Sequence, residues 1–360
     1  MAADWSQLPR ELLQLISQKL NRELYLIRSR SVCSWWRSSI PNYYQKHYLP
    51  VKFGQLSCQL FGSHTNVDAI SYLIKHDIFL IKPPKHKQTL HQCPWLIRIG
   101  PNFDGKTQLL YPFLFNSYKP LPSCFNNVLD FNKLSVIHLR QMSYIYCRCC
   151  LKSYVATCQG EQPLVFLTTD LHGNPIMFRC GDDRSKTIPN MSANMSTFRG
   201  RYVCYFRGRP CMVDKTGRTV MIESDLSYHF IAEPVIGGES KFLVETSDFQ
   251  LLLVDIYKND DRVIVRIDVF RLDEKQKKWV KLTNLGDLVL FLESDYSFSA
   301  CASDLGLGSG NCVIYNNGIT LDFNMSVFHL DQGRISPLSD YPDHLKMFGP
   351  PPEWIAELHS

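Results

Sequence analysis

The feature that most constrains this chain is the crowding of apolar and aromatic side chains into its first forty residues. Leu12, Leu13, Ile16 and Leu20 recur at spacings of three and four, so we expect a helix that carries them on one face. Pro9 suits the first turn of that helix, where no N–H donor is needed. So short a segment cannot bury this much apolar surface alone, so it needs the rest of the chain or another protein.

A further helix is expected at the end of the same stretch. Ser31 is its expected N-cap, Val32, Trp35 and Trp36 fall on its adjacent faces, and Ile40-Pro41 ends it. Two interpretations fit this pattern. The helices are either a cap on the following domain or a docking module for the helices of a partner protein.

The spacing of particular residues favours the docking module. Residues 3–41 strongly resemble the F-box, because they carry Leu8-Pro9-x-Glu11-Leu12-Leu13-x-x-Ile16-x-x-x-Leu20 followed by Arg30-Ser31-Val32-Cys33-x-x-Trp36-Arg37. The resemblance implies that this segment binds the Skp-family adaptor of a cullin–RING ubiquitin ligase. By that resemblance, the apolar contact with the adaptor comes from Leu8, Pro9, Leu12, Leu13, Ile16, Leu20, Val32, Cys33 and Trp36.

Length and charge limit the other possibilities. A chain of 360 residues has room for two domains of unequal size. Its net charge of +5 is too small to indicate nucleic-acid binding, and the basic run at residues 82–87 is typical of a solvated linker. The first residues are acidic and aromatic, and no run of about 18 apolar residues occurs, so we expect neither a secretory signal nor a membrane span. We therefore expect nuclear or cytoplasmic residence, and not secretion.

The cysteines are the candidate metal ligands. Their number, thirteen, is odd and they are scattered, which favours reduced thiols over a disulfide framework. The cluster Cys147-Arg148-Cys149-Cys150, with Cys158 further on, could be a zinc site, but such a site usually needs two C-x-x-C-like pairs. Cys147 and Cys149 alternate as the inward residues of a strand do, so we interpret them as core cysteines. We expect neither a metal nor a cofactor.

Short strands dominate the chain after the helices. Residues 42–100 are interpreted as a transitional segment that contains the first strands, at 72–82 and 95–99. Residues 101–355 are interpreted as a β-propeller-like domain, and its sheets can take in the strands of the transitional segment from about residue 72 onward. The remaining expected strands are 108–115, 134–139, 144–147, 163–169, 175–180, 202–206, 210–213, 219–223, 241–245, 250–255, 263–272, 279–282, 288–292, 312–315, 325–330 and 335–338. Four strands in about fifty residues match a propeller repeat, although an irregular β-sandwich is an alternative. The expected fold is thus mainly β, a small N-terminal three-helix F-box followed by a propeller-like domain.

The second half of the chain also resembles a known family. It carries Phe242-Leu243-Val244-Glu245, Leu251-Leu252-Leu253-Val254, Lys278-Trp279-Val280 and Gly310-Asn311-Cys312-Val313-Ile314-Tyr315. These stretches are similar to the C-terminal domain of a large family of plant F-box proteins, formerly a domain of unknown function and now classed as a β-propeller. Asn316-Asn317-Gly318 departs from the acidic residues that often follow in that family.

Signatures of catalysis are missing from the sequence. No G-x-S-x-G, H-E-x-x-H, Walker or G-x-G-x-x-G motif occurs. Asp170-Leu171-His172 and Asp260-Asp261 are possible acid/base pairs, but both fall in expected hairpin turns, where aspartate bonds the backbone. We therefore expect no catalytic residue, and no central pocket lined by convergent carboxylates or histidines.

The sequence thus predicts a non-catalytic adaptor. We expect the F-box to bind a Skp-family adaptor, and through it a cullin, in an SCF-type ubiquitin ligase. The propeller would bind a target protein for ubiquitination and proteasomal degradation. One alternative is an F-box interaction protein that sequesters a partner outside a ligase, and another is a propeller-type hydrolase or lyase. We expect binding neither to nucleic acid nor to a membrane.

Overall fold

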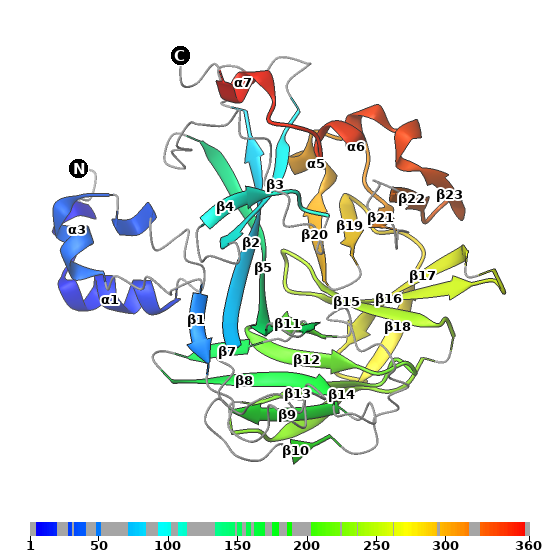
Figure 1. Cartoon of the computed structure of the whole chain (residues 1–360), viewed down its shortest axis with the longest axis horizontal. Helices are drawn as coiled ribbons and strands as arrows, with labels where there is room; N and C mark the ends of the chain where they lie inside the picture. The colour runs from blue at the N-terminus through cyan, green and yellow to red at the C-terminus, as the bar shows by residue number, and fades with distance from the viewer. Residues whose placement is uncertain are drawn as a thin grey trace.

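Sheets of short strands fill most of the molecule, and the N-terminal helices lie beside them on one side (Figure 1). The computed structural model describes these residues of the chain: 5–19, 28–30, 32–40, 48–51, 71–83, 93–101, 107–113, 134–147, 150–152, 156–159, 162–169, 175–179, 186–188, 203–223, 225–235, 237–261, 263–293, 296–316 and 325–356. None of the helices in these ranges is long and apolar enough to cross a membrane.

The N-terminal module consists of the 3-10 turn η1 (Trp5–Gln7), α1 (Arg10–Lys19), a helical turn at residues 28–30, and α3 (Ser34–Ser39). The predicted cap at Ser31 is wrong, because α3 begins later. Cys33 is the N-cap, and its Sγ accepts a hydrogen bond from the Trp36 backbone N–H at 3.5 Å. The helix ends at Ser39, as the Ile40-Pro41 pair predicted.

Three of the five sheets formed by the described strands are consecutive four-stranded antiparallel meanders. The first contains β7 (Ala156–Gln159), β8 (Gln162–Thr169), β9 (Pro175–Arg179) and β10 (Lys186–Thr187). The second contains β11 (Val203–Phe206), β12 (Arg209–Val213), β13 (Thr219–Ile222) and β14 (Tyr228–Ala232). The third contains β15 (Ser240–Glu245), β16 (Leu251–Lys258), β17 (Ile264–Asp273) and β18 (Lys278–Leu282). This repeat is the unit from which propeller blades are built.

The first and last sheets are more complex. The first has the order β4-β3-β2-β5-β6 with β1 paired to β2, and contains β1 (Tyr48–Val51), β2 (Ser71–Lys82), β3 (Trp95–Pro101), β4 (Thr107–Leu110), β5 (Ser135–Cys147) and β6 (Cys150–Lys152). The last has the order β20-β19-β21-β22-β23 and contains β19 (Leu288–Leu292), β20 (Ser297–Cys301), β21 (Cys312–Asn316), β22 (Met325–His329) and β23 (Arg334–Pro337). Here β19 and β21 pair in parallel, and the connection between β20 and β21 includes α5 (Ala302–Leu305).

The sheets meet along their inner strands. β5 lies against β20, β20 against β15, and β15 against β11, while β12 contacts β7. Two hydroxyls join neighbouring inner strands: Ser297 Oγ donates to the Leu243 carbonyl at 2.5 Å, and Ser299 Oγ donates to the Glu245 carbonyl at 3.2 Å. Buried apolar clusters fill the spaces between adjacent sheets. This side-by-side series of sheets is the arrangement of a propeller.

The end of the chain ties the last sheet to the first. After η4 (Leu338–Asp340) and α6 (Pro342–Lys346), the chain runs beside β3 before α7 (Glu353–Ala356). The Leu96 N–H donates to the Met347 carbonyl at 3.0 Å, and the Trp95 indole N–H donates to the Gly349 carbonyl at 3.2 Å. The Trp354 indole N–H then bonds the Cys93 carbonyl at 3.2 Å. These bonds connect the segment that follows the last sheet to β3 and Cys93 of the first sheet's side of the domain.

Most expected strands are present, with informative differences. The strand predicted at 108–115 is wrong in its second half: β4 ends at Leu110, and residues 112–113 form a turn because Pro112 has no N–H to donate. β5 extends through the strand expected at 144–147. Six strands were not predicted: β1, β6, β7, β10, β14 and β20. Strands β2 and β3, in the segment interpreted as transitional, belong to the first sheet. Leu20, Ser31, Cys149 and the group Asp170-Leu171-His172 lie outside the described residues.

Candidate functional site

Two tryptophans join the parts of the N-terminal module. The Trp35 indole N–H donates to the Leu8 carbonyl at 2.9 Å, and the Trp36 indole N–H donates to the Trp5 carbonyl at 2.9 Å. Neighbouring side chains of α3 thus hold the segment that precedes α1. This fixes Leu8 and Pro9, the start of the F-box-like pattern, against the helix that carries its end.

The interior of the module contains few residues. Leu13 and Ser17 are buried on the face of α1 that packs against α3, and Ser39 and Ile40 are buried at the end of α3. The Ser17 hydroxyl donates to the Gln14 carbonyl at 2.7 Å, which satisfies it without a partner outside the helix. Of the residues predicted to share one face of this helix, Leu13 is buried, whereas Leu12 and Ile16 are exposed.

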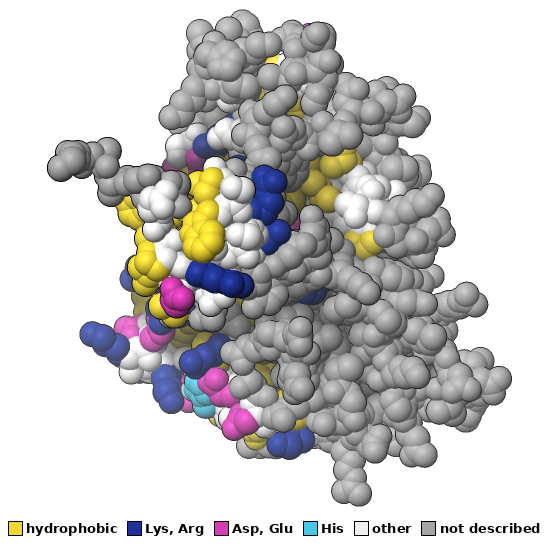
Figure 2. Space-filling model, turned by 90° about the vertical axis from the view of Figure 1, so that its left-hand side faces the viewer, with side chains coloured by type: hydrophobic (Ala, Val, Ile, Leu, Met, Phe, Trp, Pro, Cys, Tyr) yellow, Lys and Arg dark blue, Asp and Glu magenta, His cyan; other side chains and the backbone are white. Residues whose placement is uncertain are grey.

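The opposite side of the module is an exposed hydrophobic surface. Of the eleven large hydrophobic side chains that are exposed in the described part of the chain, six lie here. We call this surface the N-terminal apolar face; it consists of Trp5, Leu12, Leu15, Ile16, Val32 and Trp35. Figure 2 shows hydrophobic side chains gathered on the side of the molecule where these helices lie. Contiguous exposed apolar surface of this kind marks an interaction site.

The predicted adaptor-binding residues divide by exposure. Leu12, Ile16, Val32 and Pro9 are exposed. Three others, Leu8, Cys33 and Trp36, are half-buried. Leu13 is fully buried and holds the module together, so its side chain is not available to a partner in this arrangement. The role of all these residues in binding an adaptor stays a prediction.

Sequence reasoning missed three members of the face. Trp5, Leu15 and Trp35 are not part of the F-box-like pattern, yet they are exposed by 65%, 55% and 46%. The signal that points to Leu15 is its position three residues after Leu12, which places both on one side of α1. No comparable periodicity identifies Trp5.

The module carries more basic than acidic residues. By sequence, residues 3–41 contain six Lys and Arg and three Asp and Glu. Three of the arginines have structural contacts: Arg30 Nη1 donates to the Ile40 carbonyl, Arg28 Nη2 donates to the Val136 carbonyl of β5 at 3.3 Å, and Arg37 Nε donates to the Arg30 carbonyl at 3.4 Å. Arg10 is exposed beside Pro9, and Arg37 is exposed on α3. A partner for this module is therefore expected to be acidic.

The propeller-like domain contains a buried polar cluster on β2 and β5. His138 Nε2 lies 2.7 Å from Asp77 Oδ1, and Gln141 Nε2 donates to the same oxygen at 3.2 Å. The imidazole also contacts the Phe79 ring, with centroids 5.0 Å apart. Both His138 and Asp77 are buried, so this pair joins β2 and β5 rather than facing a substrate.

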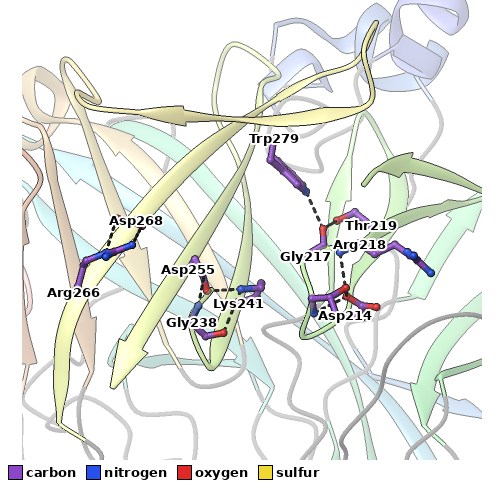
Figure 3. Close-up of polar contacts among 11 residues, drawn as sticks. Asp214, Gly217, Arg218, Thr219, Gly238, Lys241, Asp255, Arg266, Asp268 and Trp279 are labelled. Atoms are coloured by element: carbon purple, nitrogen blue, oxygen red, sulfur yellow. Dashed lines mark hydrogen bonds and ion pairs between the residues drawn. The ribbon is translucent and has the colours of Figure 1, made fainter. Parts of the chain in front are cut away.

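The polar contacts of the second and third meanders are also structural (Figure 3). Asp214 accepts bonds from the Thr216 N–H at 2.8 Å and the Arg218 N–H at 3.1 Å, which closes the turn between β12 and β13. The Trp279 indole N–H donates to the Gly217 carbonyl at 2.8 Å and joins β18 to that turn. Such bonds satisfy polar groups between sheets.

One buried ion pair lies within the third meander. Lys241 Nζ is 2.5 Å from Asp255 Oδ1, and both side chains are completely buried (Figure 3). The Gly238 N–H donates to Asp255 Oδ2 at 2.9 Å. A side chain at Gly238 would place its Cβ 2.3 Å from the Ile256 carbonyl oxygen, so this approach requires glycine. Because neither charge is accessible, the pair stabilises the fold and offers no reactive group.

The possible acid/base pair Asp260-Asp261 is exposed in the turn between β16 and β17. Its position agrees with the hairpin turn expected from the sequence. No group of three or more His, Cys, Asp or Glu side chains among the described residues is arranged to hold a metal ion. Cys147 and Cys150 are backbone partners across the hairpin between β5 and β6.

A second exposed region lies at the hairpin turns of the last two meanders. The Arg207 guanidinium makes a bidentate contact with Glu274, at 3.0 and 2.8 Å, and its backbone N–H donates to Glu245 at 2.8 Å. In the turn after Glu245, Phe249 is exposed and has a φ of 60°. An exposed aromatic residue in a conformation that L-residues rarely adopt is a feature typical of recognition loops.

Fold and site together define the class of protein: a propeller-like β-domain joined to a small helical module with an exposed apolar face. Residues 69–333 match the family model described as KIB1-4 beta-propeller, and the chain therefore belongs to this family. The resemblance to plant F-box proteins with a C-terminal propeller and the predicted mainly β fold are confirmed.

Relatives match over nearly the whole chain. F-box protein SKIP23 of Arabidopsis thaliana is 32% identical over 400 aligned residues, which cover 98% of this chain and 96% of the relative. F-box protein At2g17036 of the same plant is 30% identical and covers 99% of this chain and 96% of its own. Among solved structures, a virginiamycin B lyase from Staphylococcus aureus aligns at 13% identity, and the alignment covers 74% of this chain and 73% of the lyase chain. The TM-score is 0.25, which is too low to bear on fold or activity.

Proposed function

We propose that this chain is the substrate-recognition subunit of an SCF-type cullin–RING ubiquitin ligase. The observation that carries the proposal is the exposure of Leu12, Ile16 and Val32, which belong to the F-box-like pattern and remain uncovered in the folded chain. Covering apolar side chains on association is favourable, so these residues are suited to bind an adaptor. That two relatives matching the whole chain are F-box proteins supports the same role.

The proposed mechanism is proximity. The N-terminal module binds a Skp-family adaptor, which connects it to a cullin, while the propeller-like domain holds the target protein. Tethering raises the local concentration of target lysines near the subunits that transfer ubiquitin. The chain itself then needs no catalytic group, and the ubiquitinated target is degraded by the proteasome. This role places the protein in the nucleus, the cytoplasm or both.

The proposed target-binding surface lies on the turns that contain Arg207, Phe249 and Glu274. The ion pair between Arg207 and Glu274 joins the β11–β12 turn to the β17–β18 turn, so loops from two sheets are held together. Loops on a rigid scaffold are the usual site of recognition. Phe249, in the turn between β15 and β16, supplies an exposed apolar anchor.

The test is a pull-down of the full chain with a purified Skp-family adaptor. The double variant Leu12→Ala/Ile16→Ala removes two exposed side chains of α1 and is expected to weaken binding by roughly a hundredfold. Leu345→Ala is the matched control, because it removes an exposed leucine of α6, which lies on the other side of the molecule from α1 and α3 (Figure 1), and it is expected to leave adaptor binding unchanged.

Absence of binding by the unaltered chain would contradict the proposal at its first step. If the adaptor binds but no cullin is recovered with the complex from a plant extract, the chain acts outside a ligase by sequestering its partner. Recovery of both adaptor and cullin would support the ligase subunit.

A further inference from the structure

We propose that Trp5 and Trp35 extend the adaptor-binding surface beyond the F-box-like pattern and form an aromatic edge that contacts an acidic part of the adaptor. This inference rests on the proposed function. It assigns a binding role to two residues that the F-box-like pattern does not include.

Both tryptophans are hydrogen-bonded to residues of the pattern, Trp35 through its indole and Trp5 through its backbone carbonyl. The Trp35 indole N–H bonds the carbonyl of Leu8, so its ring lies beside the first residue of the pattern. The Trp5 carbonyl accepts a bond from the indole of Trp36, the tryptophan that belongs to the pattern. A partner that covers Leu8 and Trp36 therefore meets Trp5 and Trp35 at the same edge.

The Trp35 ring is held in place before binding, and both tryptophans are exposed. The bond to Leu8 holds the Trp35 side chain in one orientation, so little conformational entropy remains to be lost when a partner binds. The Trp5 ring is exposed by 65% and the Trp35 ring by 46%, even though each could bury a large area. Tryptophan is the residue most enriched at interface positions that dominate binding energy.

The charge of the module identifies the character of the partner. By sequence, residues 3–41 contain six basic against three acidic residues, and Lys and Arg side chains lie next to the hydrophobic ones on this face (Figure 2). Arg10 and Arg37 are exposed at the surface that a partner would meet, and Arg37 Nε also donates to the Arg30 carbonyl at 3.4 Å. A basic target or a second copy of this basic module would be repelled, which leaves an acidic adaptor surface as the occupant.

The experiment measures the dissociation constant between the full chain and a purified Skp-family adaptor. Trp5→Ala and Trp35→Ala are each expected to weaken binding by about thirtyfold, which corresponds to about 2 kcal/mol. Trp35→Phe keeps an aromatic ring but loses the indole N–H that orients it, so its loss of affinity is expected to lie between those of the unaltered chain and Trp35→Ala. Leu345→Ala, which removes an exposed hydrophobic side chain of α6 on the propeller-like domain, is expected to bind as the unaltered chain does.

One variant separates contact from folding, and a salt series tests the contribution of the charges. Trp5 contributes to the module through its backbone carbonyl, which Trp5→Ala keeps, so this variant decides the question if Trp35→Ala loses its helices. Raising the salt concentration from about 0.1 M to about 1 M should weaken adaptor binding, because exposed charges are screened.

Each outcome bears on one of the two proposals. If the unaltered chain binds and both tryptophan variants bind within roughly twofold of it, the aromatic edge is not part of the interface and only the proposed function stands. If the unaltered chain does not bind at all, the proposed function fails. Loss of affinity in Trp5→Ala with intact helices supports the aromatic edge.

Discussion

The buried pair of Lys241 and Asp255 allows a quantitative test of what holds the third meander together. Its two charges are completely buried and 2.5 Å apart. The substitution Lys241→Met removes the ammonium and keeps most of the side-chain length. Asp255 is then left as a buried carboxylate with the Gly238 N–H and the Tyr257 hydroxyl as its remaining partners.

The expected cost follows from burial. Breaking a buried ion pair by removing one partner costs about 3–5 kcal/mol, because the other charge stays uncompensated. The matched control is Lys281→Met: Lys281 Nζ lies 3.0 Å from Asp268 Oδ1, but the lysine side chain is 53% exposed. Asp268 is buried but keeps Arg266 as a partner at 2.5 Å, and the Lys281 ammonium is screened by solvent, so this variant should lose at most about 1 kcal/mol.

The assay is urea unfolding followed by tryptophan fluorescence and far-UV circular dichroism on the same samples. Lys241→Met is expected to lower the unfolding midpoint well below that of Lys281→Met. The double variant Lys241→Met/Asp255→Leu should recover much of the loss, because it removes both charges from the interior. If Lys241→Met is within about 1 kcal/mol of the unaltered chain, the argument from an uncompensated buried charge is refuted.

Two other predictions concern titratable groups. Burial, together with nearby His329, lowers the pKa of His344 below its ordinary value of 6.5 against the opposing effect of Asp343, so the unfolded chain takes up this proton more readily. The free energy of unfolding should therefore fall as the pH drops through 6.5 toward the lowered pKa. Urea unfolding at about pH 5.5 and about pH 7.5 should show a smaller fall in His344→Gln than in the unaltered chain. An equal fall in both proteins would contradict this. Burial raises the pKa of Cys204 to about 12 and that of Cys211 well above its ordinary value. Iodoacetamide at neutral pH should therefore modify neither thiol until the chain unfolds. Mass mapping that finds either cysteine labelled in the folded protein would contradict their placement as buried thiols.

The helices of the N-terminal module could be predicted from the sequence, but their inward face could not. Leu12 and Leu13 are separated by about 100° around α1, and each has a neighbour four residues on, Ile16 and Ser17. The buried face is the one that contains Leu13 and Ser17. A serine whose hydroxyl bonds its own helix packs as a small residue, so hydrophobic periodicity alone selects the wrong stripe.

A similar cause hid the inner strand β20. It alternates serine with Phe298 and Ala300, and serine ordinarily indicates a turn. Here the hydroxyls of Ser297 and Ser299 bond carbonyls of β15, which is possible only once the two sheets meet. Tertiary contact therefore decides this strand. The buried partners Lys241 and Asp255, in contrast, were within reach of the sequence, because the turn centred on residue 248 fixes their register.

The junction between the module and the propeller-like domain explains why an apolar surface remains exposed. Arg28 Nη2 bonds the Val136 carbonyl of β5, a polar contact that consumes none of the N-terminal apolar face. If the helices were only a cap on the domain, apolar burial at the junction would be expected to cover Leu12 and Ile16. Both are exposed instead. The polar attachment therefore favours a docking module that keeps its hydrophobic side free for a partner.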